Sequence, residues 1–138
     1  MSNNSKRFSN WDYPDIEDGK PTKYHWIVQN IDNFQLGFET DIGAFSYINA
    51  KNGVVIENKV QIGSHCSLYS VSTIDNMSGK VVLKQNCKIG SHTTILPGVT
   101  VGKNSIVGAN SLVNKDIPDN VIAFGIPAKV VKIIKNAE

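Results

Sequence analysis

Aliphatic residues return at every sixth position along most of this chain. Neither an α-helix, with 3.6 residues per turn, nor a flat strand, with a side-chain period of two, produces that spacing. Two steps are longer, by two residues around Lys51–Gly53 and by three residues between Asp75 and Lys80. The series consists of Leu36, Ile42, Ile48, Ile56, Ile62, Leu68, Ile74, Leu83, Ile89, Ile95, Val101, Val107 and Val113. A fixed internal period of this kind predicts a solenoid of stacked repeats.

The residue two places before each aliphatic position is usually small or compact, as at Ser46, Cys66 and Ser105. Residues i and i−2 lie on the same face of a strand, so each hexapeptide predicts a short strand with two inward side chains. Asparagines in the turns suit left-handed backbone angles. Glycines directly follow several aliphatic positions, where we expect the missing Cβ to ease a tight bend: Gly37, Gly43, Gly63, Gly90, Gly102 and Gly108.

Three strand-and-turn units close one triangular coil, and stacked coils bury the aliphatic positions that a single coil leaves exposed. The sequence therefore predicts an all-β fold, a parallel β-helix of about four coils. We place this β-helix at residues 36–117, an N-terminal arm and cap at 1–35, and a C-terminal cap at 118–138. The last segment includes "PAKVVKIIKNAE", which is expected to form a short helix or strand over the final coil.

Composition restricts the classes of function. A chain of 138 residues with 41% hydrophobic residues fits one folded domain, and a net charge of +2 without a dense Lys/Arg block argues against a nucleic-acid partner. No apolar run is long enough to cross a bilayer and the N-terminus does not look like a signal peptide, so we expect no membrane partner and a cytoplasmic location. Cys66 and Cys87 take inward positions, where cysteine behaves as a small apolar residue rather than as a metal ligand or acyl carrier.

The stretch from Cys87 to Lys132 contains "IGSH", "LPGVTVG", "NKDIPDNV" and "GIPAKV" in that order. In these motifs the chain resembles the left-handed β-helix hexapeptide acyltransferases, and its C-terminal half is similar to the galactoside and maltose O-acetyltransferases. The resemblance implies a left-handed β-helix, a homotrimer, and acetyl-CoA bound as acyl donor in grooves between neighbouring prisms. A cleft between two flat-walled prisms suits a long pantetheine arm. Residues 1–35 resemble no family that we can assign.

The same resemblance implies five positions that contact acetyl-CoA. Ser91 and Ala109 are small enough to let the pantetheine arm approach the backbone, and Asn114 stands where the family usually has threonine. Lys115 and Lys132 are expected to meet the phosphates as point charges, although the family usually has arginine at the second position. In a structural β-helix without this ligand, both lysines would be ordinary solvated charges.

The histidine that the O-acetyltransferases use as catalytic base has no counterpart here. In that family it lies in a longer loop, whereas this chain has only "YSVSTIDNMSGK", which contains no histidine. His65 is expected to point outward near a corner, either as the general base or as an ordinary turn residue. Asp75 is the second catalytic candidate, to orient an ammonium or hydroxyl group, or else a solvated loop residue. We expect His25 to belong to the cap, and His92 to be structural or adjacent to the cofactor.

The missing histidine bears on the reaction. An alcohol must lose a proton as it attacks a thioester, whereas a neutral amine already carries its lone pair and depends less on a base. Related hexapeptide enzymes acetylate amino groups of nucleotide-linked deoxyamino sugars for surface glycans. The predicted function is therefore acetyl-CoA-dependent N-acetylation of such a sugar nucleotide. O-acetylation of a sugar or glycan hydroxyl and a non-catalytic β-helix scaffold are the alternatives.

No metal site is expected. Carbonic anhydrases of this architecture need three histidines that converge on zinc, and the two in the repeats, His65 and His92, are expected on different faces of the prism. Four aromatic residues of the N-terminal segment either anchor it by packing or stack on a nucleotide base: Trp11, Tyr13, Tyr24 and Trp26.

Overall fold

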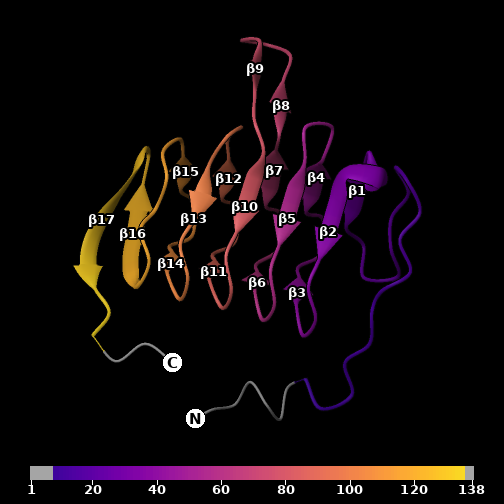
Figure 1. Cartoon of the computed structure of the whole chain (residues 1–138), viewed down its shortest axis with the longest axis horizontal. Coiled ribbons are helices and arrows are strands. Elements are labelled where there is room, and N and C mark those ends of the chain that lie inside the picture. Colours follow the sequence, from indigo (N-terminus) through magenta and orange to yellow (C-terminus); the bar gives the residue numbers. More distant parts are fainter. Residues whose placement is uncertain (1–7, 136–138) are drawn as a thin grey trace.

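The computed structural model describes residues 8–135 and confirms a nearly all-β parallel β-helix (Figure 1). The described chain contains strands β1 to β17 and a 3₁₀ turn, η1 (Ile31–Asn33). From β1 to β15, apart from the hairpin of β8 and β9, successive strands lie on three sheets in turn, so the chain returns to the same sheet once per coil. Among the described residues, no helix has the length and hydropathy needed to span a bilayer.

Three sheets form the walls of the prism. Sheet A contains β1 (Ile27–Gln29), β4 (Tyr47–Asn49), β7 (Ser67–Tyr69), β12 (Thr94–Ile95) and β15 (Leu112–Val113). Sheet B contains β2 (Phe34–Leu36), β5 (Val54–Ile56), β10 (Val81–Leu83) and β13 (Thr100–Val101). Sheet C contains β3 (Asp41–Ile42), β6 (Gln61–Ile62), β11 (Lys88–Ile89), β14 (Ile106–Val107), β16 (Val121–Gly125) and β17 (Ala128–Ile133).

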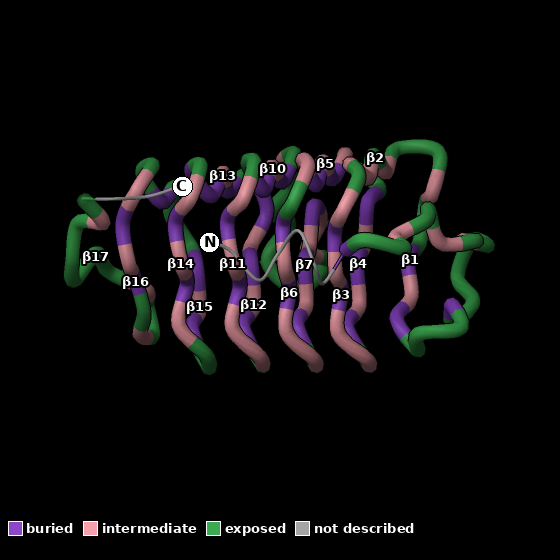
Figure 2. The backbone as a smooth tube through the Cα atoms, turned by 90° about the horizontal axis from the view of Figure 1, so that it is seen from below, coloured by how far each residue is buried: buried purple, intermediate pink, exposed green. Residues whose placement is uncertain are grey.

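The register stacks equivalent repeat positions on one another. In sheet C, Ile62 pairs with Ile89, and Ile89 pairs with Val107. The inward positions form one continuous core along the prism, drawn purple in Figure 2, and both cysteines are 0% exposed within it. Each fully buried aliphatic side chain contributes roughly 1.5–3 kcal/mol. The predicted inward strand pattern is confirmed except at the repeat that contains Ser72 and Ile74.

Between β7 and β10 the chain leaves the coil and forms a projecting hairpin. Strands β8 (Val71–Ser72) and β9 (Met77–Ser78) pair antiparallel and rise above the prism in Figure 1. The backbone N–H of Gly79 donates to the carbonyl oxygen of Ser70 at 2.9 Å and closes the base of the hairpin. Ile74, predicted to face inward, is 98% exposed, so this prediction is wrong. The six-residue period predicts a strand of the prism at Ile74, but this part of the chain belongs to the projecting hairpin.

The glycines that follow aliphatic positions serve close stacking and not a bend. A Cβ at Gly43 would lie 2.4 Å from the backbone nitrogen of Ser64 in the next coil, and one at Gly90 would lie 2.5 Å from that of Ala109. Neither glycine has a positive φ. The expectation of an eased bend is therefore wrong for them, because what excludes a side chain is the neighbouring coil.

Left-handed backbone angles occur instead at the third residue after each aliphatic position, at two of the three corners of the prism. The asparagine edge, between sheets B and C, consists of the corners at Glu39, Lys59, Asn86, Asn104 and Asn120. The histidine edge, between sheets C and A, consists of the corners at His25, Phe45, His65, His92 and Asn110. The hairpin edge, between sheets A and B, consists of residues 50–53, 70–80, 96–99 and 114–116.

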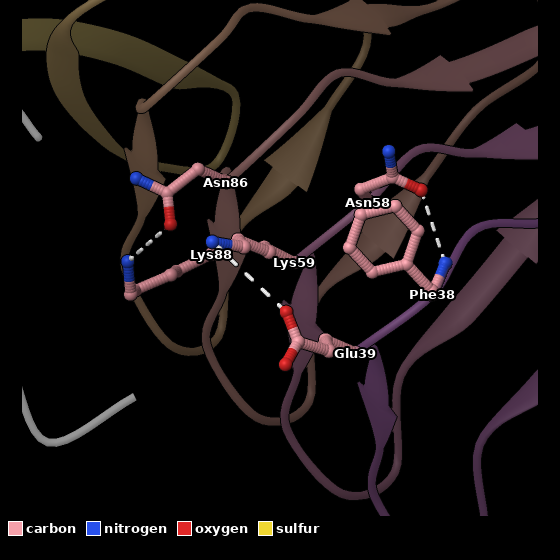
Figure 3. Close-up of polar contacts among 6 residues, drawn as sticks. All are labelled: Phe38, Glu39, Asn58, Lys59, Asn86 and Lys88. Carbon is pink, nitrogen blue, oxygen red and sulfur yellow. Dashed lines mark hydrogen bonds and ion pairs between the residues drawn. The ribbon is translucent and has the colours of Figure 1, made fainter. Parts of the chain in front are cut away.

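Side chains on the asparagine edge bond to one another. Asn86 Nδ2 donates to Asn104 Oδ1, and Asn104 Nδ2 donates to Asn120 Oδ1, each at 2.9 Å. Figure 3 shows the earlier corners, where Lys59 Nζ lies 4.0 Å from the Glu39 carboxylate. Such an exposed ion pair contributes at most about 1 kcal/mol. The contacts on this edge hold coils together, and we assign it a structural role.

The two ends of the prism are covered differently. At the C-terminal end, β17 pairs antiparallel with β16, so the expected helix or strand is a strand. At the N-terminal end, β1 pairs with β4, and Trp26, only 3% exposed, packs into the core. The outermost parts of the expected terminal segments, residues 1–7 and 136–138, lie outside the described residues.

We predict that Gly90→Ala destabilises the fold by about 3 kcal/mol, because the new Cβ must displace the backbone of the next coil. Gly98→Ala is the matched control: its φ is +85° and nothing lies within 4 Å of an added Cβ, so only backbone strain of about 1 kcal/mol is expected. Denaturant unfolding of both variants measures the difference. If both variants lose the same free energy of unfolding, contact with the neighbouring coil is not the reason for glycine at position 90.

The two thiols are predicted to be unreactive in the folded protein. Burial raises the pKa of Cys87 to about 12 and also raises the pKa of Cys66. Because the thiolate is the reactive form, a thiol reagent at pH 8 should modify native protein only as fast as it unfolds. Raising the pH toward 10 should accelerate modification in denaturant far more than in native buffer. Rapid modification of the native chain at pH 8 would contradict this prediction.

Candidate active site

The histidine edge brings several candidate residues onto successive coils. Its turns have the sequences "IGAF" (42–45), "IGSH" (62–65 and 89–92) and "VGAN" (107–110). The backbone N–H of His92 donates to the carbonyl oxygen of Ser64 at 3.0 Å, and that of Asn110 to Ser91 at 2.9 Å. These bonds hold equivalent residues of neighbouring turns directly above one another.

Four of the corner side chains form a ladder of rings along this edge. The ring centroids are 6.0 Å apart between His25 and Phe45, and 5.2 Å apart between Phe45 and His65. His65 and His92 stack with centroids 4.6 Å apart and ring planes within 6° of parallel. The imidazole of His65 is therefore exposed to solvent but held between two neighbouring rings.

The corners of this edge adopt the same left-handed backbone as those of the asparagine edge. His65 has φ of 58° and Phe45 has φ of 65°, in a region that is uncommon for residues other than glycine, although asparagine and histidine adopt it more readily than most. Asparagine occupies most of the equivalent corners of the asparagine edge at the same angles. On the histidine edge these angles direct rings outward at the surface.

The expectation that His65 and His92 lie on different faces is wrong. They are one coil apart on one edge, because residues 70–80 form a hairpin and do not add a side to the prism. Within residues 8–135 no group of three or more His, Cys, Asp or Glu side chains could hold a metal ion.

Cys66 follows His65 but points the other way. Its sulfur lies 3.2 Å from the carbonyl oxygen of Gly90, and burial raises the pKa of the thiol. A buried thiol with a raised pKa is a poor nucleophile, so this geometry does not suit a covalent acyl intermediate on sulfur.

Ser91 and Ala109 lie on the histidine edge, one coil apart, immediately before His92 and Asn110. Ser91 is partly buried and Ala109 is exposed. Together with His65 they form one surface strip that combines a possible base with two small residues. Of the seven residues proposed from the sequence, the structure brings these three together on one edge.

The other three candidate cofactor residues lie elsewhere on the C-terminal coils. Asn114 and Lys115 are exposed on the hairpin edge, directly after β15. Lys132 is exposed on β17 and pairs with Ile122, toward the asparagine edge. A single chain therefore presents the five candidate acetyl-CoA contacts at separate corners of the prism.

Asp75 is exposed in the turn between β8 and β9, on the hairpin edge. His65 lies on the histidine edge, on the opposite side of β7. The structure does not bring the two catalytic candidates together within one chain. Any joint role would require that they come from different copies.

The sequence analysis did not predict that His92 stacks on His65. The tetrapeptide "IGSH" occurs at both 62–65 and 89–92, and identical turns at equivalent repeat positions are expected to lie on neighbouring coils of one edge. Counting Ile74 as a full repeat concealed it.

The comparisons with known proteins agree with this architecture. Residues 80–115 match the family model described as bacterial transferase hexapeptide (six repeats). A galactoside O-acetyltransferase of Lactococcus lactis subsp. lactis (strain IL1403) is 34% identical over 117 residues, which cover 74% of this chain and 56% of the relative.

Two solved structures with similar folds contain coenzyme A or its acetyl form. A galactoside acetyltransferase in complex with coenzyme A is 30% identical, with a TM-score of 0.73, over 80% of this chain and 60% of that one. A hexapeptide-repeat-containing acetyltransferase of Vibrio cholerae O1 biovar eltor, complexed with acetyl coenzyme A, is 26% identical, with a TM-score of 0.76, over 80% of this chain and 66% of that one.

This chain spans 56% of the length of the Lactococcus relative and 60% of the solved galactoside acetyltransferase. The similarity nevertheless covers most of the described prism. By its repeat and its stacked coils this chain is a parallel β-helix of hexapeptide repeats, and it is similar to bacterial hexapeptide transferases over most of its length.

Proposed function

We propose that this protein is an acetyl-CoA-dependent N-acetyltransferase that acts on the amino group of a nucleotide-linked deoxyamino sugar. The observation that carries this proposal is the histidine edge, where His65 lies on the same strip as Ser91 and Ala109. The two similar structures in complex with coenzyme A or acetyl coenzyme A support acetyl-CoA as the acyl donor.

The active form is proposed to be a homotrimer. Ser91 and Ala109 lie on the histidine edge, whereas Lys115 lies on the hairpin edge and Lys132 on β17. A second prism packed alongside the first would place one copy's hairpin edge against another copy's histidine edge. The cleft between them would then bring Ser91 and Ala109 of one copy together with Lys115 of another, while Lys132 lies outside it, toward the asparagine edge. Such a cleft suits a long, flexible acyl donor.

In the proposed reaction, the amine nitrogen of the sugar attacks the carbonyl carbon of the thioester. The carbonyl oxygen takes up negative charge, which a backbone N–H of the cleft stabilises, and the C–S bond then breaks to release coenzyme A as a thiolate. The attacking nitrogen is left with one surplus proton. His65 accepts this proton and returns it to the thiolate, so the products are an amide and a free thiol.

The short hairpin favours an amine over an alcohol as acceptor. Residues 70–80 contain no histidine, and His65 is the nearest one before them in the sequence. A hydroxyl group needs a base throughout its attack, whereas a neutral amine needs mainly correct positioning. Asp75, at the tip of this hairpin, is proposed to hold the acceptor in a neighbouring copy's cleft.

O-acetylation of a sugar or glycan hydroxyl is the second candidate. The observation that favours it is the 34% identity to a galactoside O-acetyltransferase. A non-catalytic scaffold is the third, and it predicts that the chain does not bind acetyl-CoA at all.

A thiol-release assay with purified full-length chain separates the three candidates. We expect coenzyme A release from acetyl-CoA with nucleotide-linked amino sugars as acceptors, and little release with the matching hydroxyl sugars. Release with galactosides alone would establish O-acetylation instead. Absence of acetyl-CoA binding in a direct titration would support the scaffold.

The role of His65 is tested by His65→Asn, which keeps the left-handed backbone because Asn110 occupies the equivalent corner of a later coil. We predict a loss in kcat of roughly 10²–10⁴-fold and the loss of one limb of the pH–rate profile. Lys59→Ala, an exposed change on the asparagine edge, serves as the control and should leave kcat unchanged. Unchanged turnover of His65→Asn at every pH would remove His65 as the base.

A further inference from the structure

The hairpin of β8 and β9 holds apolar side chains away from the prism. Ile74 is 98% exposed in its turn, and Met77 on β9 is 42% exposed. The hairpin rises above the coils in Figure 1, and half of residues 71–78 spans roughly 13 Å at the rise of a strand. Two apolar side chains on a projecting turn add nothing to the core, and exposed apolar surface of this kind marks interaction sites.

The histidine edge offers a surface of matching character. The ring of Phe45 is 65% exposed, and His65 and His92 are exposed beside it. Their stacking, with centroids 5.2 Å and then 4.6 Å apart, makes the three rings one continuous strip. At the level of the hairpin the asparagine edge instead presents Lys59 and Asn86, whose side chains contact polar neighbours.

The hairpin and His65 belong to the same coil. His65 is the corner directly before β7, and the hairpin leaves the prism directly after β7. Copies related by rotation about an axis parallel to the prism have equivalent coils at equal heights. The hairpin of one copy then reaches its neighbour at the height of His65, between Phe45 on the preceding coil and His92 on the following one.

The two edges used in this contact allow a closed assembly. The histidine edge lies between sheets C and A and the hairpin edge between sheets A and B, so both border sheet A. Each copy can therefore give its hairpin to one neighbour and receive a hairpin from the other. Three such contacts close a ring with sheet A toward the axis, and no open filament results.

Polar groups on the two surfaces also match. Asp75 follows Ile74 and is the one acidic residue of the hairpin. Its carboxylate, like the imidazoles of His65 and His92, has no hydrogen-bond partner in the described part of the chain. An ionised carboxylate accepts hydrogen bonds, and an imidazole N–H donates one. The hairpin thus pairs an apolar and an acceptor group with a strip that offers an apolar ring and donors.

We propose that the hairpin of each copy docks on the histidine edge of a second copy of this chain. In this contact Ile74 packs against the exposed ring of Phe45, and Asp75 lies beside His65 and His92. The docked hairpin covers the part of the histidine edge that a single chain leaves open. The inference rests on the proposed function only for the number of copies, three.

Sedimentation velocity over a range of concentrations tests the contribution of the hairpin to assembly. We expect the unchanged full-length chain to form trimers, and Ile74→Ser to need at least tenfold higher concentration to do so. Ile126→Ser is the matched control, because Ile126 is 76% exposed on another surface, and it should assemble like the unchanged chain. Far-UV circular dichroism checks that each variant is folded. If Ile74→Ser assembles at unchanged concentration, the proposal fails.

A cross-link locates the surface on which the hairpin docks. Ile74→Cys is combined with Phe45→Cys, and diamide removes two hydrogens from the paired thiols to form a disulfide. Cys66 and Cys87 are 0% exposed and should not take part. We expect bands at two and three times the chain mass on a non-reducing gel. Ile74→Cys combined with Lys59→Cys, on the asparagine edge, is the control and should stay at the chain mass. If the position-45 pair cross-links no more than the position-59 pair, the proposal is overturned.

These measurements use neither acetyl-CoA nor a sugar, so they are independent of turnover. A trimer that depends on Ile74 and cross-links through position 45 would support the interface even if no acetyl transfer were observed. Conversely, acetyl transfer by a protein whose assembly does not depend on Ile74 would sustain the proposed function and reject this interface.

Discussion

The spacing between stacked strands constrains every other feature of this structure. Adjacent coils lie one strand apart, roughly 4.8 Å, all the way around the triangle, so each corner must pack against the corner above it. Where the chain leaves sheet C, a Cβ at Gly43 or Gly90 would collide with the next backbone, and only glycine fits. Two residues further on, the chain turns through left-handed angles, and this fixes the direction in which the corner side chain projects.

The period of six was enough to predict the β-helix, the inward cysteines and the outward corners, because one repeat position has one environment throughout the prism. It failed at Ile74, because spacing alone does not distinguish a strand of the prism from a strand of a projecting hairpin. That one miscount separated His65 from His92 and concealed their stacking. The pocket between the N-terminal arm and the first coil was beyond prediction, since it depends on how a segment without repeats folds back onto that coil.

The asparagine edge and the histidine edge share the same left-handed corner backbone but differ in what their corner side chains do. On the asparagine edge the corner amides bond to one another from coil to coil, so their hydrogen-bonding groups are occupied with holding the stack. On the histidine edge, rings occupy equivalent corners at a backbone cost that asparagine would avoid. Ring stacking returns only part of that cost, roughly 0.5–1.5 kcal/mol per pair. Glu39 and Lys59 hold the same angles on the asparagine edge, so the stacked, outward rings and not the backbone cost distinguish the histidine edge.

The interior of the prism is a continuous apolar core, so any chemistry must take place on its outside. Flat walls built from short strands offer no enclosed site of their own, and a ligand can be surrounded only where something else covers an edge. In one chain the N-terminal arm does this at one end of the prism, where it forms part of a solvent-open pocket lined by Trp11 and Tyr24. Along the rest of the histidine edge no segment of the described chain plays that part. The catalytic proposal therefore depends on a second copy to complete the site.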